Sequence, residues 1–296
     1  FKPLALGKLG DGWIVASETV AFDQTGAEFV REIEPGELVT IDEHGPRSEF
    51  FADQKDIKPS FCMFEFVYFA RPDSVIFNQT VHTVRRRMGR ILAKECPVEA
   101  DVVCAIPDSG RSAGLGFSEQ LSIPYDRGFV RNHYVGRTFL APLQAERARA
   151  AQLKHNVIKD VMAGRRVVLV DDSLVRGTTM KSLVHQVRAA GAREVHLRIS
   201  CPPNRHPCYY GVDFPTREEL IANNLTIREI EKTLNVDTLG YLSEEGMLDA
   251  VGMAPNHFCT ACWSGNYPVP VPSENSDKLS MTQGVLVKDE VVGGAR

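Results

Sequence analysis

The chain has 296 residues, enough for one large or two modest domains with a substantial core. Hydrophobic residues make up 43% and charged residues 24% of the sequence, as in ordinary globular proteins. A net charge of −4 gives no electrostatic basis for binding nucleic acid or an anionic membrane, and no apolar stretch approaches transmembrane length.

The first 50 residues alternate short apolar runs with turn residues such as Gly10-Asp-Gly12 and Glu43-His-Gly45, which predicts hairpin-rich β structure. Polar residues 52–60 are typical of a linker. No signal peptide is evident, but Phe1 is not a natural start, so an upstream targeting segment is not excluded. We expect a cytoplasmic protein, or a plastid one if a transit peptide precedes this sequence.

An aromatic-rich segment, residues 61–74, ends in a turn and leads into an amphipathic helix. The apolar positions that indicate the helix are Val81, Val84, Met88, Ile91 and Leu92. We expect the triplet 85–87, three arginines, to lie on the solvated face of this helix, and a phosphate-binding role is the less favoured alternative.

A buried strand is predicted at residues 101–106, followed by the tight polar turn Pro107-Asp-Ser-Gly110. Such a turn at the carboxyl end of a strand can offer backbone N–H groups to a pyrophosphate and oxygen ligands to Mg²⁺. Residues 124–155 are polar and basic with little apolar periodicity. They fit either an exposed loop with a short helix or a lid that closes over a ligand.

The most informative stretch is residues 167–179, with the sequence VVLVDDSLVRGTT. Its first four residues form the continuous apolar run typical of a strand buried on both faces of a parallel sheet. Asp171 and Asp172 follow at the carboxyl end of that strand, where open α/β sheets bind ligands. A short loop then leads into a helix with apolar residues at the helical period, which we expect to end at Gly191.

This arrangement suits a ribose 5-phosphate. The loop and the helix N-terminus offer unpaired N–H groups, and Ser173, Thr178 and Thr179 add hydroxyl donors for a phosphate. The carboxylates of Asp171 and Asp172 suit the ribose hydroxyls and Mg²⁺. The alternative is a buried strand that ends in two exposed turn aspartates.

A third strand is predicted at residues 194–200, so the strand–helix–strand order favours an α/β fold with a parallel sheet. Residues 216–219 and 226–229 both have the pattern of a capping box that opens a helix. Residues 271–296 are polar and aperiodic, as expected of a C-terminal tail.

Residues 167–179 closely resemble the phosphoribosyl pyrophosphate (PRPP) signature of type I phosphoribosyltransferases, and with its flanks the chain is similar to the glutamine PRPP amidotransferases. The resemblance implies the first committed step of purine biosynthesis, in which ammonia from glutamine displaces pyrophosphate from PRPP to give 5-phosphoribosylamine. It also implies a homo-oligomer, a tetramer in the family, that purine nucleotides inhibit. The rivals are a base-specific phosphoribosyltransferase and a PRPP-binding regulator without turnover.

The same resemblance implies the domain organisation. Residues 1–57 would be the C-terminal part of a β-rich N-terminal-nucleophile (Ntn) glutaminase domain. Residues 58–270 would be the phosphoribosyltransferase domain, a parallel sheet with flanking helices, and residues 271–296 the tail. Because the family's glutaminase domain begins with a nucleophilic cysteine and this sequence begins with Phe1, we expect a truncated sequence that cannot hydrolyse glutamine.

The resemblance assigns roles to individual residues. Tyr134, Arg137 and Thr138 match the lid that closes over PRPP in the family. The implied catalytic residues are Asp171, Asp172 and Arg137, and the implied Mg²⁺ ligands are Ser109, Asp171 and Asp172. The implied PRPP-binding residues are Asp108, Ser109, Gly110, Ser173, Arg176, Gly177, Thr178 and Thr179.

Seven cysteines, an odd number in a chain of this length, favour a reducing compartment over a disulfide scaffold. By itself, Cys259-Thr-Ala-Cys262 fits a redox dithiol, half a zinc site or chance. Cys62, Cys208, Cys259 and Cys262 fall where iron–sulfur members of the resembling family carry their ligands. Four thiolates suit either Zn²⁺ or a [4Fe-4S] cluster, and the resemblance implies the cluster, in a structural role.

Overall fold

The computed structural model describes residues 1–131, 155–214 and 216–271. The lid residues Tyr134, Arg137 and Thr138 and nearly all of the expected tail therefore lie outside the described residues. No helix in the described ranges combines the length and the apolar character that crossing a membrane requires.

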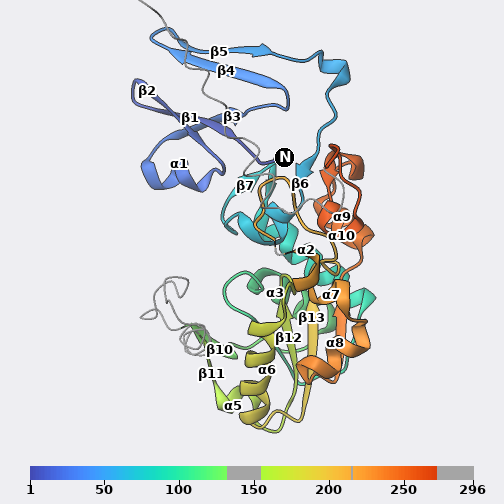
Figure 1. The fold of residues 1–296 in the computed structure, drawn as a ribbon. Coiled ribbons are helices and arrows are strands. Elements are labelled where there is room, and N and C mark those ends of the chain that lie inside the picture. The colour runs from blue at the N-terminus through green and yellow to red at the C-terminus, as the bar shows by residue number, and fades with distance from the viewer. Residues whose placement is uncertain (132–154, 215, 272–296) are drawn as a thin grey trace, which may run out of the picture.

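A four-stranded parallel sheet forms the centre of the larger part of the molecule (Figure 1), with the strand order β14-β13-β12-β9. Its strands are β9 (Val102–Ala105), β12 (Arg166–Asp171), β13 (Glu194–Ile199) and β14 (Thr238–Tyr241). All four residues of β9 and the four residues 167–170 of β12 are buried, which explains their uninterrupted apolar sequences. The predicted parallel sheet is confirmed.

The chain reverses direction across this sheet between β9 and β12. After β9 it passes through α3 (Arg111–Leu121) to Tyr125, which forms an isolated parallel bridge with Val103 of β9. It then returns to β12, on the other side of β9, and continues outward to β13 and β14. The carboxyl ends of β9 and β12 thus form a topological switch point, the place where open α/β sheets bind ligands.

Helices cover both faces of the sheet, because right-handed crossovers that run in opposite directions leave their helices on opposite faces. On one face α3 packs against α2 (Val81–Glu95), which in turn contacts α9 (Glu244–Val251). On the other face α6 (Thr178–Ala189) lies beside α8 (Ile227–Leu234) (Figure 1). The remaining short helices are α5 (Lys159–Met162), α7 (Ile221–Asn224) and α10 (Ala261–Ser264).

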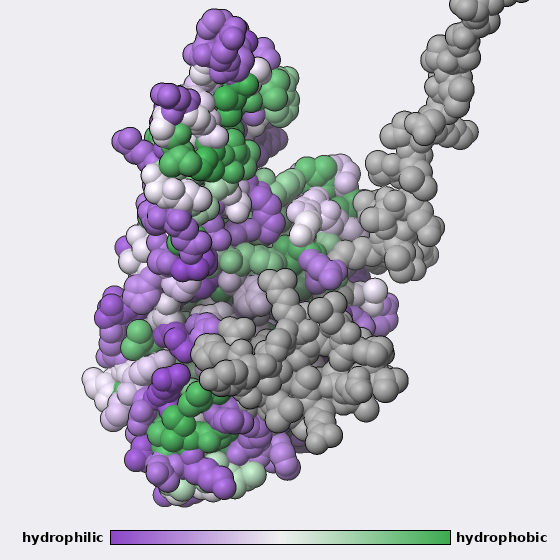
Figure 2. Space-filling model, turned by 90° about the vertical axis from the view of Figure 1, so that its left-hand side faces the viewer, coloured by the Kyte–Doolittle hydropathy of each residue, from purple (hydrophilic) through white to green (hydrophobic). Residues whose placement is uncertain are grey.

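The N-terminal residues form two separate antiparallel groups, which lie at one end of the molecule (Figure 1). The first contains β1 (Ala5–Leu9), β2 (Gly12–Ala16) and β3 (Glu28–Glu32), with α1 (Val20–Thr25) between β2 and β3; the second is the hairpin of β4 (Glu37–Asp42) and β5 (Gly45–Phe50). The predicted hairpins are confirmed, whereas α1 was not expected. Apolar side chains gather on the surface of this part (Figure 2), and those exposed include Val15, Phe29, Val30, Leu38 and Ile41.

Three further short strand pairs lie outside these sheets. They are β6 (Phe61–Cys62) with β15 (Phe258–Cys259), β7 (Val75–Ile76) with β8 (Gln79–Thr80), and β10 (Phe129–Arg131) with β11 (His155–Val157). The parallel pair β6–β15 joins the start of the predicted phosphoribosyltransferase region to its last helical segment.

Two sequence predictions are wrong in part. Thr216 does not cap a helix with its side chain, and residues 217–219 form a single 3₁₀ turn, whereas Thr226 and Glu229 do form the expected capping box. The arginine triplet does not lie on a solvated face as a whole. Arg85 is only 2% exposed, because its side chain points into the protein and donates hydrogen bonds to backbone carbonyls.

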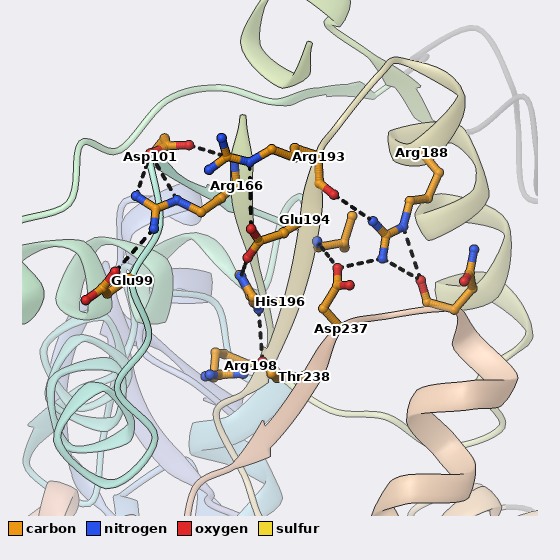
Figure 3. Close-up of polar contacts among 12 residues, drawn as sticks. Glu99, Asp101, Arg166, Arg188, Arg193, Glu194, His196, Arg198, Asp237 and Thr238 are labelled. Carbon is orange, nitrogen blue, oxygen red and sulfur yellow. Dashed lines mark hydrogen bonds and ion pairs between the residues drawn. The ribbon is translucent and has the colours of Figure 1, made fainter. Parts of the chain in front are cut away.

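Ion pairs link the strands at their N-terminal ends (Figure 3). Arg166, at the start of β12, lies 2.9 Å from Asp101, and Arg188 of α6 lies 2.6 Å from Asp237, which precedes β14. Asp237 also accepts a 2.6 Å hydrogen bond from the backbone N–H of Val195. Hydrogen bonds to Arg166 lower the pKa of Asp101 to about 2. These ion pairs therefore link neighbouring strands at the end of the sheet opposite to the carboxyl ends of its strands.

Helices α2 and α3 cross at two glycines. A Cβ added at Gly89 would lie 1.9 Å from the carbonyl oxygen of Ala113, and one added at Gly116 would lie 1.9 Å from that of Arg86. Both distances are far inside van der Waals contact, so the backbones could not approach as they do with a side chain at either position. Because α3 follows directly on residues 107–110, this crossing also sets the position of that loop.

We predict that Gly116→Ala lowers the free energy of unfolding by about 3 kcal/mol, because the two helix backbones would have to separate. Chemical denaturation measures the change. The control is Gly12→Ala, whose Cβ would lie at an ordinary 3.5 Å from the nearest atom and should change stability by less than about 0.5 kcal/mol. Equal effects of the two substitutions would contradict the proposed tight crossing.

Candidate functional site

Two loops meet at the switch point between β9 and β12. The hydroxyl of Ser109, from the loop after β9, donates a short hydrogen bond to the carboxylate of Asp172, which follows β12. The hydroxyl of Ser173 donates to the other oxygen of the same carboxylate, Oδ1, at 2.5 Å. Asp172 is 5% exposed, so both hydrogen bonds help to compensate a charge that is removed from water. The structure therefore brings Ser109 of the first loop next to Asp172 and Ser173 of the second, 63 residues further along the chain.

Gly110 allows this close approach. A Cβ at this position would lie 2.6 Å from the carbonyl oxygen of Val170 and 3.2 Å from the Cα of Asp171. The loop after β9 therefore packs directly on the last residues of β12, as only glycine permits. Gly110 lines neither of the cavities described below, so its contribution is to position Ser109 next to Asp172.

The neighbouring aspartates have different electrostatic environments. Burial, together with the charge of Asp172, raises the pKa of Asp171 well above its ordinary value. The backbone N–H of Asp172 donates a 2.9 Å hydrogen bond to Asp171 Oδ1, which acts in the opposite direction. A pair of carboxylates held this way favours binding of a cation, since a divalent ion would relieve their repulsion.

The N-terminus of α6 supplies the donors. Gly177 is the N-cap of the helix, has φ 77°, and has no side chain that could accept from the N–H groups of the first turn. These N–H groups have no acceptor within the helix, so they and the helix dipole favour an anion. Thr178 and Thr179 occupy the first two positions of α6 and line the same cavity as the aspartates.

A cavity of about 570 Å³ contains this site. The sequence-predicted residues that line it are Ser109, Asp171, Asp172, Ser173, Arg176, Gly177, Thr178 and Thr179. Arg176 lies at its rim, where it forms an exposed ion pair with Glu219 at 2.8 Å. Arg137 lies outside the described residues.

Other residues that line the cavity had no predicted role. Tyr68 and Phe69 come from the aromatic-rich segment 61–74, and Val212, Asp213 and Phe214 from the segment that follows β13. Tyr68, Phe69 and Ser109 also line a second cavity of about 350 Å³, which Asp108 and Arg85 line as well. The aromatic composition of residues 61–74 was a visible signal in the sequence, but it did not indicate which cavity they line.

The four cysteines expected to bind a cluster lie around one further cavity. Cys62 and Cys259 are direct partners in the parallel pair β6–β15, and Cys262 lies one turn further on, in α10. Cys208 comes from the segment after β13, and its sulfur accepts a 3.3 Å hydrogen bond from the backbone N–H of Tyr210. Segments that are nearly 200 residues apart in sequence therefore converge here.

Two kinds of metal site take four thiolates. Within residues 1–131, 155–214 and 216–271, no three His, Cys, Asp or Glu side chains are placed to hold one metal ion. Tetrahedral Zn²⁺ requires its ligand atoms within about 2.3 Å of one centre. A [4Fe-4S] cluster binds each thiolate to a different iron, so it suits four thiols that share a cavity without meeting at a point.

Burial favours the protonated form of three of these thiols, those of Cys62, Cys259 and Cys262, when nothing is bound to them. It raises the pKa of Cys62 to about 11 and that of Cys262 well above the ordinary value, and it also raises the pKa of Cys259. Binding of metal would therefore release protons, as is usual for thiolate sites.

Comparisons with known proteins agree with the geometry. The amidophosphoribosyltransferase of Mycobacterium tuberculosis is 48% identical over 280 residues, which cover 93% of this chain and 53% of that protein. The corresponding enzyme of Methanothermobacter thermautotrophicus is 48% identical over 280 residues, or 95% of this chain and 59% of that protein. No protein-family profile matches the chain.

A solved structure of glutamine PRPP amidotransferase from B. subtilis, complexed with ADP and GMP, superimposes with a TM-score of 0.84 at 46% identity. The match covers 92% of this chain and 60% of that one, so this chain spans little more than half the length of the proteins it resembles. The parallel sheet with flanking helices that the sequence predicted is thus the fold of a known PRPP-dependent enzyme.

The raised pKa of Asp171 leads to a prediction about pH. Between the ordinary pKa of an aspartate and this raised value, the folded protein binds a proton that the unfolded chain does not, so stability falls as pH rises through this interval. Asp171→Asn should remove this loss and give a higher Tm than the parent protein at neutral pH, with a smaller difference near about pH 4. The exposed Asp11→Asn is the control, and an unchanged Tm across this range for Asp171→Asn would contradict the prediction.

Proposed function

Because the chain is homologous to amidophosphoribosyltransferases over nearly its whole length, we propose that it carries the phosphoribosyl-transfer site of such an enzyme, a pentosyltransferase of purine biosynthesis. The single observation that supports this proposal best is the 570 Å³ cavity, where a carboxylate pair faces the N-terminus of a helix at the switch point of the sheet. The N–H and hydroxyl groups at one end can donate to a phosphate, and the carboxylates at the other end can accept from the ribose hydroxyls. Together they match a ribose 5-phosphate.

In the proposed reaction the nitrogen of ammonia forms a bond to C1 of PRPP while the bond from C1 to the diphosphate oxygen breaks. Pyrophosphate leaves with the electron pair of that bond, and the new amine gives up a proton to water. Asp171 and Asp172 would orient the ribose, and the first turn of α6 would bind the 5-phosphate. Bound Mg²⁺ would supply charge that stabilises the leaving pyrophosphate, and the oxygens of Ser109, Asp171 and Asp172 would hold it.

The wider organisation belongs to the same proposal. Residues 1–57 would be part of a glutaminase domain, residues 58–270 the phosphoribosyltransferase domain, and Arg137 would act from a lid. Purine nucleotides would inhibit, since a similar protein was solved with ADP and GMP, and the chain would act in the cytoplasm or a plastid as a homo-oligomer. The rivals, a base-specific phosphoribosyltransferase and a PRPP-binding regulator, would use the same cavity and are distinguished by assay.

We further propose that Cys62, Cys208, Cys259 and Cys262 bind a [4Fe-4S] cluster in a structural role. The support is the convergence of four thiols around one cavity. Transfer of a phosphoribosyl group involves no electron transfer. A bound cluster would instead join α10 and β15 to β6 and to the segment after β13.

The catalytic proposal predicts release of pyrophosphate from PRPP that depends on both ammonia and Mg²⁺. Asp172→Asn should lower this rate by at least about a hundredfold, because it removes one charge of the carboxylate pair. A coupled pyrophosphate assay measures the rate, and circular dichroism checks the fold. The matched control is Asp126→Asn, a substitution outside the cavity. Turnover that required a purine or pyrimidine base as acceptor would contradict the proposal, and binding without turnover would favour the regulator.

The cluster proposal predicts about four iron and about four acid-labile sulfide per chain after anaerobic purification. Cys208→Ser should lower both contents. Cys96→Ser should leave them unchanged, because Cys96 lies near Arg198 and does not line the cysteine cavity. Elemental analysis and visible absorption measure the content. Stoichiometric zinc without iron, or protein free of both metals, would contradict the cluster.

A further inference from the structure

Arg85 of α2 is a buried cation whose charge no carboxylate neutralises at ion-pair distance among the described residues. Its Nε donates to the carbonyl oxygen of Phe66 at 2.5 Å, and its Nη2 donates to that of Ala70 at 2.8 Å and to that of Glu65 at 3.4 Å. These acceptors are neutral carbonyls, so they orient the guanidinium without cancelling its charge. A buried charge without a counter-ion is costly and is therefore informative.

The remaining terminal nitrogen, Nη1, is available to a ligand. In the part of the chain that the structure describes, it has no hydrogen-bond acceptor. It is also not one of the four fully buried side-chain atoms that lack a partner there, so it keeps contact with solvent. Since the residue as a whole is 2% exposed, this contact is confined to a small opening.

Arg85 lines the 350 Å³ cavity together with Arg71, Asp108 and Ser109. This cavity shares Ser109 and Pro107, as well as Tyr68 and Phe69, with the 570 Å³ cavity of the aspartates. The two cavities are therefore neighbours on either side of Ser109.

PRPP has the shape that two neighbouring cavities would accept, because its 5-phosphate and its diphosphate extend from opposite ends of the ribose. With the 5-phosphate at the N-terminus of α6 and the ribose at Asp171 and Asp172, C1 would lie toward Ser109 and the diphosphate would extend into the cavity beyond it. We propose that Arg85 binds this diphosphate through Nη1, both in PRPP and in the released pyrophosphate. This inference rests on the proposed function and adds a residue to its site.

The other charges around Arg85 are compatible with an anion. Asp108 forms an ion pair with Arg111 at 2.9 Å, and Arg71 forms one with Asp73 at 2.8 Å, so both are compensated. Burial lowers the pKa of Arg85 to about 10, while the charges of Asp172, Glu18 and Glu65 favour its protonated form. The guanidinium thus stays charged at neutral pH and would stabilise the negative charge that develops on the leaving group.

A purely structural role for Arg85, holding the π-helix Glu65–Phe69 through its carbonyls, makes a different prediction. Loss of that support would weaken the binding of every molecule that occupies the site. Loss of a side chain that contacts the diphosphate would weaken the binding only of molecules that contain a diphosphate. Ribose 5-phosphate, which has the sugar and the 5-phosphate alone, separates the two roles.

The test compares Arg85→Lys with Arg86→Lys, a control on the same helix whose exposed side chain pairs with Glu119. Calorimetric titration in the presence of Mg²⁺ measures the affinity for pyrophosphate and for ribose 5-phosphate. We expect Arg85→Lys to weaken pyrophosphate binding by about tenfold and ribose 5-phosphate binding by less than about twofold, with no change in the control. Equal weakening of both ligands, or of neither, would overturn the inference.

A second measurement uses the unaltered protein, in case Arg85→Lys does not fold. Crystals soaked with magnesium pyrophosphate should show a phosphoryl oxygen within hydrogen-bond distance of Arg85 Nη1, and density for pyrophosphate elsewhere would overturn the inference. Different results would refute the proposed function and the proposed role of Arg85. A parent protein that bound neither ribose 5-phosphate nor PRPP would refute the proposed function itself, whereas one that bound both without contact to Arg85 would refute only this inference.

Discussion

The candidate site depends on one close contact, between the loop after β9 and the last residues of β12. Gly110 brings the loop so close that a Cβ would lie 2.6 Å from the carbonyl oxygen of Val170, and Ser109 then reaches the carboxylate of Asp172. This contact compensates a buried charge and fixes the boundary between the two cavities. The glycine crossing of α2 and α3 supports it from behind, since α3 begins directly after Gly110.

Much of this arrangement could be predicted from the sequence, because buried parallel strands and amphipathic helices leave clear periodic signals. Residues 167–170 and α6 were both predicted, and Gly191, at φ 92°, lies just beyond the helix as expected. The burial of Arg85 was missed although the signal was present. The residue lies four residues after Val81 and three before Met88, on the apolar stripe of α2. Its charge predicted exposure to solvent, whereas its position on the apolar stripe predicted burial, and the position was the better predictor.

The cysteine site shows where local patterns stop being informative. Cys62 and Cys259 become neighbours only because β6 and β15, each two residues long, pair in parallel. Strands this short have no period that a sequence could reveal, and Cys208 lies in a segment without regular structure. Only the resemblance to a family grouped these cysteines in advance. The fold then brings them together around one cavity.

The cysteine cavity and the proposed PRPP cavity are not independent, because they share a wall. Val212 and Phe214 line both, and they follow Cys208 within a few residues of the same segment. Phe214 also packs edge-on against Phe64, which stacks on Trp263 of α10, next to Cys262. A group bound to the four thiols would therefore also limit the movement of that wall. A structural cluster far from the reacting atoms would in this way contribute to the shape of the cavity in which they meet.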